Sequence, residues 1–232
     1  SLVRAAQACQ DGALAYQTPF ISGKDSLNNE FQCEDGTQIS IPPTLLISAV
    51  GIVDDVSKCV TMDVKNPGNL LFIVGLTKNE LGGSHYYKIK DQLGANCPTV
   101  DLGLAPKIAE HIHKAIDAGI VASCHDCSEG GVAVALAEMA FAGGLGIEAS
   151  LAGLPISDDC TMNFAKLFSE SNSRYIVEVK PENYNEFAQL MLNLPFGQLG
   201  EVVSHKNLII TTKDGSELIN ADIGKLKQSW QS

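Results

Sequence analysis

The stretch IVASCHDCSEGGVAVALAEMAF, residues 120–141, carries the strongest structural signal in the sequence. Its apolar beginning, residues 120–123, predicts a short strand, and the Ala-rich residues 131–141 predict a helix. Polar residues and two consecutive glycines separate these two elements. A turn of this kind places unpaired backbone N–H groups and the positive end of the helix dipole beside the strand end, which is an arrangement that favours an anion.

Four side chains or backbone positions of this turn are candidates for ligand binding. Gly130 and Gly131 would let the oxygens of an anion come close to the backbone. Ser128 is placed either to cap the helix or to contact a ligand, and Asp126 is placed to hold Mg²⁺ between protein and phosphate. The alternative is a helix that simply follows a tight turn, and the residues alone leave both interpretations open.

The same stretch contains a single C-x-x-C pair, Cys124 and Cys127. Zinc sites need further ligands at recognisable spacing, and the sequence offers no second pair, so metal or redox chemistry is disfavoured. The chain has seven cysteines, an odd number with irregular spacing, which favours a reduced, cytosolic setting. We expect the lone cysteines to be small core residues; they are Cys9, Cys33, Cys59, Cys97 and Cys160.

A second candidate segment is Ser-Gly-Lys-Asp-Ser, residues 22–26. It resembles the end of a phosphate-binding loop, but Asp25 interrupts the motif and the upstream glycine is missing, so a Walker motif is excluded. Gly23, Lys24 and Ser26 still suit a ligand loop, because they combine backbone access, a point charge and a hydroxyl donor. The alternative is a surface turn with solvated charges.

A third polar segment, residues 168–174, precedes a predicted strand. It is either a loop that lines a site or a loop that contains an Arg174–Glu170 contact, and its spacing does not decide between them.

Apolar periodicity predicts the remaining elements. The predicted helix at residues 104–118 places Ile108, Ile112, Ala115 and Ile116 on one face. The mixture of elements predicts an α/β fold of the α+β type, with a mixed sheet and a domain boundary near residue 56. Further helices are predicted at residues 3–17 and 182–193, and strands at residues 44–53 (buried), 58–63, 70–76, 146–150, 174–179, 196–203, 208–212 and 217–219.

Charge and composition exclude several classes of partner. The chain of 232 residues has 16 basic and 27 acidic side chains, for a formal charge of −11 and a pI near 4.8. This balance argues against nucleic acid and against an anionic membrane surface. The sequence has no apolar stretch of about 20 residues and no secretory signal at its start, so we expect a cytoplasmic protein.

Four blocks of sequence, in order and at matching spacing, resemble one known family. They are TPFISGKDSLNNE (18–30), PPTL before AVG (42–51), ELGGS (80–84) and HDCSEGG running to AEMAFAG (125–143). The chain resembles the C-terminal half of the large subunit of phosphoribosylformylglycinamidine (FGAM) synthase. More broadly, it is similar to the aminoimidazole-ribonucleotide (AIR)-synthetase-like superfamily.

The resemblance implies both a fold and a reaction. Residues 1–56 correspond to the C-terminal portion of a second AIR-synthetase-like N-terminal domain, which contributes to a shared barrel, and residues 57–232 to the C-terminal α/β domain. Members of the family are ATP-dependent ligases of de novo purine biosynthesis. It converts formylglycinamide ribonucleotide (FGAR), glutamine-derived ammonia and ATP to FGAM, glutamate, ADP and phosphate, after phosphorylation of the amide oxygen of FGAR.

The resemblance also assigns roles to the two candidate segments. Nucleotide, either ATP or ADP, and Mg²⁺ are the implied cofactors. In the family the second of two clefts sometimes holds an auxiliary, structural nucleotide. The implied nucleotide-binding residues are Gly23, Lys24, Ser128, Gly130 and Gly131, the implied substrate-binding residues are Asp25 and Ser26, and the implied metal ligand is Asp126.

Two positions depart from the family pattern. Lys24 stands where smaller members have an Asn metal ligand, and a cation cannot ligate Mg²⁺, so Lys24 is expected to contact phosphate directly. His85 stands where the family often has Glu, and the sequence gives it no role.

The family's catalytic His and further Mg²⁺ ligands lie in the first half of the subunit. We therefore expect no catalytic residue in this chain and no FGAM formation by the chain alone. The implied partners are the missing N-terminal half and a glutaminase domain or subunit, with or without a small bridging subunit. The alternatives are a nucleotide-binding structural module of the same subunit, or another AIR-synthetase-like ATP-dependent enzyme.

Overall fold

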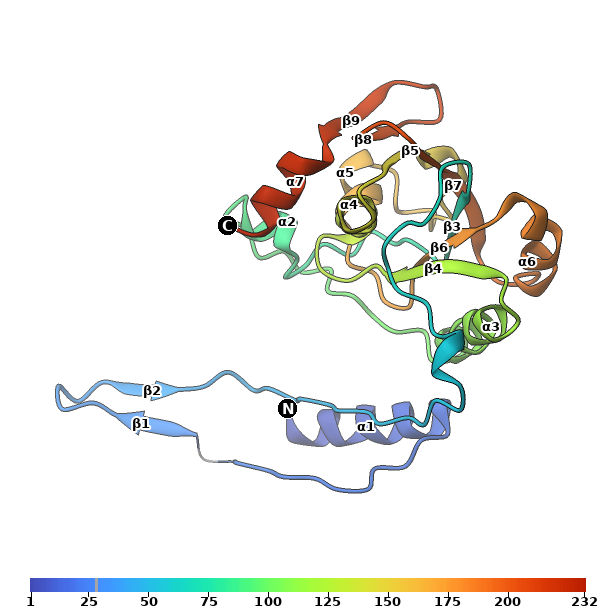
Figure 1. The fold of residues 1–232 in the computed structure, drawn as a ribbon. Helices are drawn as coiled ribbons and strands as arrows, with labels where there is room; N and C mark the ends of the chain where they lie inside the picture. Colours follow the sequence, from blue (N-terminus) through green and yellow to red (C-terminus); the bar gives the residue numbers. More distant parts are fainter. Residues whose placement is uncertain (28) are drawn as a thin grey trace. The chain divides into compact units, whose positions relative to one another are not determined.

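The computed structural model describes residues 1–27 and 29–232, and the chain divides into two compact units, residues 1–54 and 55–232 (Figure 1). Among the residues that it describes, no helix combines the length and the apolar character needed to cross a bilayer.

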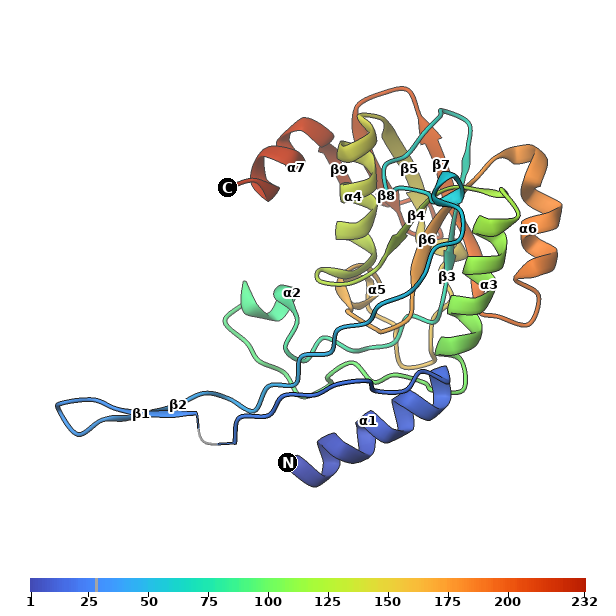
Figure 2. The same cartoon turned by 60° about the horizontal axis from the view of Figure 1, so that its bottom comes forward.

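The described residues of the first unit form one helix and one hairpin. Helix α1 (Leu2–Tyr16) ends where Gln17 takes a left-handed conformation. Strands β1 (Glu30–Gln32) and β2 (Gln38–Ser40) pair antiparallel at the end of extended segments (Figure 2). None of the residues described in this unit is buried. Its apolar side chains therefore lack the burial that stabilises an independent core.

The predicted buried strand at residues 44–53 is wrong for this structure. The segment forms no strand, and its apolar side chains face solvent, with Val50 92% and Ile52 94% exposed. The apolar composition predicts burial, but burial also requires neighbouring strands, and the described residues of this unit supply none to this segment.

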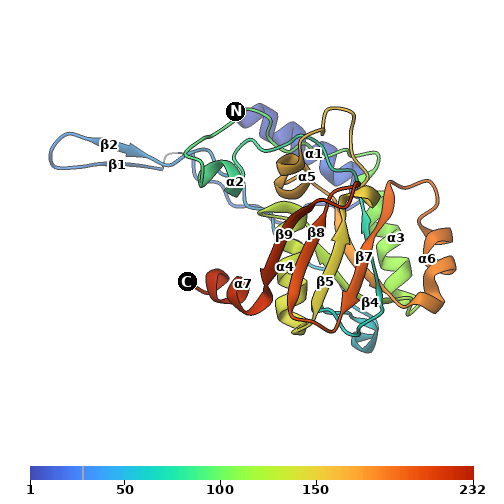
Figure 3. The same cartoon turned by 90° about the horizontal axis from the view of Figure 1, so that it is seen from above.

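The second unit is built on a seven-stranded sheet with the order β4-β6-β3-β7-β5-β8-β9. Figure 3 shows its strands β7, β5, β8 and β9 side by side. Neighbouring strands are antiparallel except for the parallel pair β5–β8. The predicted mixed sheet is confirmed. The strands are β3 (Leu70–Val74), β4 (Val121–Asp126), β5 (Gly146–Ser150), β6 (Tyr175–Val179), β7 (Phe196–Val203), β8 (Asn207–Thr211) and β9 (Glu217–Asp222).

Strand alternation sends side chains to two different cores. On β3, Leu71 and Ile73 pack into the core beneath α4 (Gly131–Gly143), whereas Phe72 and Val74 pack on the other face with α3 (Ala105–Asp117) and α6 (Tyr184–Leu190). Helices thus cover both faces of the sheet at β3 and β6. Consistent with this, β3 and β6 are almost continuously apolar.

Helix α3 follows its predicted amphipathic pattern. Ile108, Ile112 and Ala115 are buried and Ile116 is half-buried. The predicted helix at residues 182–193 is shorter, because a 3-10 turn over Pro181–Asn183 precedes α6.

The predicted strand at residues 58–63 is wrong. A 3-10 helix occupies Val56–Lys58, because the Asp55 carboxylate accepts the Ser57 N–H at 2.9 Å and closes the turn. An ion pair between Lys58 and Asp117 (2.6 Å) ties this turn to the end of α3. Three short helices have no counterpart in the sequence-based prediction: α2 (His85–Lys88), α5 (Asn163–Phe168) and α7 (Ile223–Trp230).

Candidate functional site

The strand–turn–helix arrangement predicted for residues 120–141 is present. Strand β4 ends at Asp126 and α4 begins at Gly131. Gly130 and Gly131 have φ angles of 77° and 67°, which side chains with a Cβ rarely adopt. A Cβ on Gly131 would lie 2.3 Å from the Ser169 carbonyl oxygen. Both glycines are therefore needed for the backbone path of the turn.

Ser128 does not cap the helix. Gly130 is the N-cap residue and α4 has no side-chain cap. The Ser128 hydroxyl instead donates a short hydrogen bond to Oδ2 of Asp126. This bond, with a smaller contribution from nearby His125, holds the pKa of the Asp126 carboxyl below its ordinary value. Asp126 is therefore ionised at neutral pH, and with 59% of its side chain exposed it is accessible to a cation.

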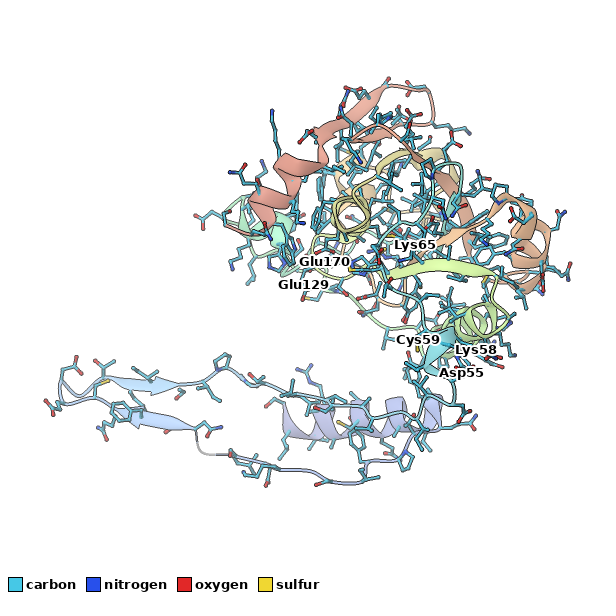
Figure 4. The ribbon with its side chains drawn as sticks, viewed as in Figure 1. Asp55, Lys58, Cys59, Lys65, Glu129 and Glu170 are labelled. Carbon is cyan, nitrogen blue, oxygen red and sulfur yellow. The ribbon has the colours of Figure 1, made fainter. Side chains whose placement is uncertain are left out.

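Glu170, part of the polar segment 168–174 that the sequence left as either a site-lining loop or an Arg174–Glu170 contact, reaches this turn from the loop after α5. Its Oε1 accepts the N–H of Gly130 and the N–H of His85, each at 2.9 Å. Figure 4 shows Glu170 close to Glu129 of the turn. The carboxylate thus satisfies a donor at the start of α4, as helix N-termini favour, and it gives His85 a backbone role.

The polar segment 168–174 is a structural loop around a buried arginine. Arg174 is 1% exposed and donates to the carbonyls of Ser171 (2.9 Å) and Ser169 (2.5 Å) and to Oγ1 of Thr77 (3.0 Å). Within the described residues, the Arg174 side chain donates its hydrogen bonds to these three groups. The loop is therefore not held by a direct hydrogen bond between Arg174 and Glu170. The Arg174 carbonyl accepts the Cys127 N–H at 2.9 Å and fixes the loop to the turn.

His125 connects the turn to two helices. Its Nε2 lies 2.8 Å from Oε2 of Glu138 on α4, and its Nδ1 lies 3.4 Å from Oδ1 of Asp126. The other oxygen of Glu138 accepts the indole N–H of Trp230 on α7 at 3.0 Å. Sequence reasoning missed this set, because its members lie far apart along the chain and only the 125–131 block marked one end of it.

The thiolate form of the C-x-x-C pair is disfavoured. Burial raises the pKa of the Cys124 thiol to about 12 and that of Cys127 to about 11, so neither forms a thiolate readily. The expectation that all lone cysteines are core residues is wrong for Cys59 and Cys97, which are exposed; Cys160 is buried, and Cys9 and Cys33 are half-buried.

Thiol labelling checks this assignment. In the native chain at pH 8 we expect an aromatic disulfide reagent to react at Cys59 and Cys97 at least 100-fold faster than at Cys124 and Cys127, because Cys59 and Cys97 are exposed, whereas burial raises the pKa of the Cys124 and Cys127 thiols. Mass spectrometry after brief labelling gives the modified positions. Fast labelling of Cys127 in folded protein would contradict the structure.

The second candidate segment lies within the first unit. Lys24 donates from Nζ to Oγ of Ser26 at 2.9 Å and to the carbonyl oxygen of Asp25. All residues from Gly23 to Ser26 are exposed, and a Cβ on Gly23 would meet nothing within 4 Å. The structure therefore brings Lys24 and Ser26 together as a polar loop, and it gives Gly23 no steric reason to be glycine.

The donor set of the turn fits Mg²⁺ only in company with a ligand. Among residues 1–27 and 29–232, no three His, Cys, Asp or Glu side chains gather to hold a metal ion. Mg²⁺ commonly binds through one or two carboxylates together with phosphate oxygens and water. Asp126, exposed beside a helix N-terminus, is the residue of this turn that would supply such a carboxylate.

A cavity of about 450 Å³ lies on the face of β5, β7 and β8. Two carboxylates, Glu148 and Glu201, line it, together with uncharged side chains. An anionic phosphate would be repelled there.

Comparison with known proteins places the chain in a family. A model described as "AIR synthase related protein, C-terminal domain" matches residues 66–213. The chain therefore belongs to the AIR synthase related proteins and carries their C-terminal domain.

Curated relatives match the chain over its whole length. One is the phosphoribosylformylglycinamidine synthase subunit PurL of Alkaliphilus metalliredigens, which is 34% identical. Another is the protein of the same name from Caldanaerobacter subterraneus subsp. tengcongensis, which is 36% identical. The resemblance predicted from the four sequence blocks is thereby confirmed. The chain spans 29% and 30% of the lengths of these two relatives.

Solved structures share the fold. PurL of Thermotoga maritima complexed with FGAR superposes with a TM-score of 0.64 at 19% identity, over 74% of this chain and 30% of that chain. A hydrogenase maturation protein HypE in complex with ATP superposes with a TM-score of 0.53 at 15% identity, over 72% of this chain and 54% of that chain. The predicted AIR-synthetase-like fold is confirmed.

Proposed function

We propose that the chain is part of an FGAM synthase, the ATP-dependent ligase that forms FGAM from FGAR, ammonia from glutamine, and ATP. The observation that carries the proposal is the strand–turn–helix at residues 126–131, an anion-favouring turn with an ionised, exposed Asp126, in a chain that matches PurL subunits along its whole length. Bound ATP with Mg²⁺ would supply the phosphoryl group that activates the amide oxygen of FGAR.

The chain's own residues have separate roles in this proposal. Asp126 contributes a carboxylate to Mg²⁺. Gly130 and Gly131 are the positions at which phosphate oxygens approach the start of α4; the Gly130 N–H now donates to Glu170 and the Gly131 N–H to the Ser128 carbonyl, so a phosphate has to displace these acceptors. Ser128 orients Asp126 through its hydroxyl and contacts the nucleotide.

The loop in the first unit belongs to the other of the family's two clefts, the one shared with the first half of the subunit. Gly23 and Lys24 contact nucleotide phosphate, and Asp25 and Ser26 contact FGAR. Lys24 already holds Ser26 by a 2.9 Å hydrogen bond, which supports a loop in which a cation and a hydroxyl act side by side.

The exposed apolar side chains of residues 1–54 support a larger assembly. We place residues 1–56 in an AIR-synthetase-like N-terminal domain whose remaining strands come from the first half of the subunit, and residues 57–232 in the C-terminal domain. The other partner is a glutaminase domain or subunit, in a cytoplasmic enzyme. FGAM formation requires these parts, since we assign no catalytic residue to this chain.

A second candidate function is a nucleotide site that stabilises the subunit without turnover. The composition of the turn favours this second function. Asp126 is the candidate metal ligand of the turn, and its neighbours Cys124 and Cys127 have thiols of raised pKa, so they do not offer a reactive nucleophile. Tightly held, unhydrolysed ADP in the purified protein would select this function over turnover at the same site.

Calorimetric titration of Mg²⁺-ADP and Mg²⁺-ATP into the full chain tests the nucleotide site. We expect micromolar binding by the unmodified chain and at least 10-fold weaker binding by Asp126→Ala, because that variant loses the charged metal ligand. Asp158→Ala is the matched control, since Asp158 is an exposed carboxylate on a different loop, and its affinity should equal that of the unmodified chain.

Two outcomes would contradict the proposal. If the folded chain binds neither nucleotide, this part of the subunit does not by itself form the nucleotide site. Failure of the chain to support FGAM formation, when combined with the first half of the subunit, a glutaminase, ATP and FGAR, would remove the ligase assignment.

A further inference from the structure

Two backbone donors from different parts of the second unit converge on one oxygen atom. Oε1 of Glu170 accepts the N–H of Gly130, the N-cap residue of α4, and the N–H of His85, the first residue of α2, each at 2.9 Å. Gly130 lies at the positive end of the α4 dipole, which favours an anion. We call the place that this oxygen fills the anion position. A phosphate oxygen placed there could accept both N–H groups in the same way.

The carboxylate of Glu170 is held at this position by one of its two oxygens. In the described part of the chain, its hydrogen bonds and its 3.6 Å approach to the His85 imidazole all use Oε1, and 16% of the side chain is exposed. A single attachment of this kind leaves the carboxylate free to swing into solvent by a change of rotamer.

The backbone that carries Glu170 is fixed independently of the carboxylate. The Glu170 N–H donates to the Glu80 carbonyl at 3.2 Å. On either side, the buried Ser169 hydroxyl donates to the Lys78 carbonyl at 2.6 Å, and the buried Ser171 hydroxyl accepts the Lys78 N–H at 3.0 Å. The side chain of Glu170 can therefore leave the anion position while the loop stays in place.

We propose that Glu170 fills a phosphate position in the ligand-free chain, and that a phosphate oxygen of the nucleotide replaces Oε1 and accepts the N–H groups of Gly130 and His85. The inference rests on the proposed function, which assigns the turn containing Gly130 to the nucleotide. It adds one binding group, the His85 N–H, and one internal competitor, the Glu170 carboxylate. The competitor lowers the apparent affinity for nucleotide by the fraction of chains in which it holds the position.

The first test weakens the competitor. Glu170→Gln keeps an acceptor oxygen for both N–H groups but removes the charge, so it exchanges charge-assisted hydrogen bonds for weaker neutral ones. In calorimetric titrations we expect Mg²⁺-ADP to bind about 10-fold more tightly to Glu170→Gln than to the unmodified chain. Glu129→Gln is the matched control, because it removes a charge from an exposed residue of the same turn and leaves the two hydrogen bonds intact. It should change the affinity by less than about 3-fold.

The second test removes the His85 N–H. Proline lacks this donor and suits the first position of a helix, and Ser84 before it has φ −69° and ψ 158°, a conformation that residues before proline favour. The comparison is made in a Glu170→Ala chain, where no side chain competes for the donor. There we expect His85→Pro to bind Mg²⁺-ADP about 10-fold more weakly than His85→Ala, which keeps the N–H and also lacks the imidazole.

A third measurement separates this inference from the proposed function. Inorganic phosphate, without metal or nucleoside, is titrated into the ¹⁵N-labelled Glu170→Ala chain, whose melting temperature confirms that it is folded. The amide signals of Gly130 and His85 should shift together with one dissociation constant, and that of Gly144 at the far end of α4 should not. If the unmodified chain binds no nucleotide, the proposed function fails, whereas this joint shift would still support the anion position.

Three results would overturn the inference. One is a pair of amide signals that phosphate leaves unmoved. Another is weaker binding of Mg²⁺-ADP by Glu170→Gln, which would make Glu170 a contributor to binding instead of a competitor. The third is an equal gain for Glu170→Gln and Glu129→Gln, which would show a general effect of charge on the turn and no occupancy of the position.

Discussion

Glu178→Ala should lower the free energy of unfolding by about 4 kcal/mol. The carboxylate is fully buried on β6 and accepts five hydrogen-bond contacts. The donors are the backbone N–H groups of Lys65 (2.9 and 3.0 Å) and Asn66 (3.2 Å), Nδ2 of Asn69 (2.7 Å) and the hydroxyl of Ser123 (2.7 Å). Alanine would leave the buried side chains of Asn69 and Ser123 and the half-buried Lys65 N–H without this acceptor, and each unsatisfied buried group costs about 1–3 kcal/mol.

Urea unfolding followed by circular dichroism measures this loss. Glu182→Ala is the control, because Glu182 is exposed at the start of the next 3-10 turn, and it should change stability by less than about 0.5 kcal/mol. Glu178→Gln should fall between the two, since the amide keeps one acceptor and turns a donor toward other donors. A Glu178→Ala chain within about 1 kcal/mol of the unmodified protein would contradict this account.

Gly131→Ala should cost about 3 kcal/mol of unfolding free energy. The residue combines a φ of 67° with a blocked side: a Cβ would lie 2.3 Å from the Ser169 carbonyl oxygen and 3.0 Å from that of Leu167. Both obstacles are backbone atoms: the Leu167 carbonyl belongs to α5, and the buried Arg174 holds the Ser169 carbonyl in place. The turn must therefore move, and under the proposed function Mg²⁺-ADP binding should be lost as well.

Gly144→Ala isolates the contribution of the conformation from that of the contact. Gly144 ends the same helix with a φ of 66°, and a Cβ there would meet nothing within 4 Å. It should cost about 1 kcal/mol, which is the penalty of the left-handed conformation alone. Equal losses for the two variants, measured by the same urea titration, would show that the Ser169 contact contributes nothing.

Local sequence patterns were sufficient to predict those features that depend on the conformation of neighbouring residues alone. The apolar spacing of Ile108, Ile112 and Ala115 predicts the buried face of α3, because helical geometry alone brings those positions together. The paired glycines 130–131 predict the turn before α4, because few other residues adopt positive φ. The candidate anion-binding turn therefore followed from sequence alone.

The remaining parts of the site depended on partners distant in the chain. Glu138, Glu170 and Glu178 look alike in the sequence as charged residues, which are usually exposed. In the fold one fixes His125, one satisfies the N–H of Gly130 and one is fully buried beneath the 65–69 turn. No local pattern distinguishes them, because their donors come from other strands and loops.

The apolar segment at residues 44–53 shows where prediction from composition fails. Its composition determined that it should be buried, and its side chains remain exposed in the structure. Hydrophobicity makes the burial of a segment favourable, but the segment is buried only where the fold supplies neighbouring elements that pack against it. The sequence by itself thus determined the family, the amphipathic face of α3 and the candidate turn. The tertiary structure decided the strand order, the buried charges and the contacts that orient Asp126, because those depend on which distant groups meet.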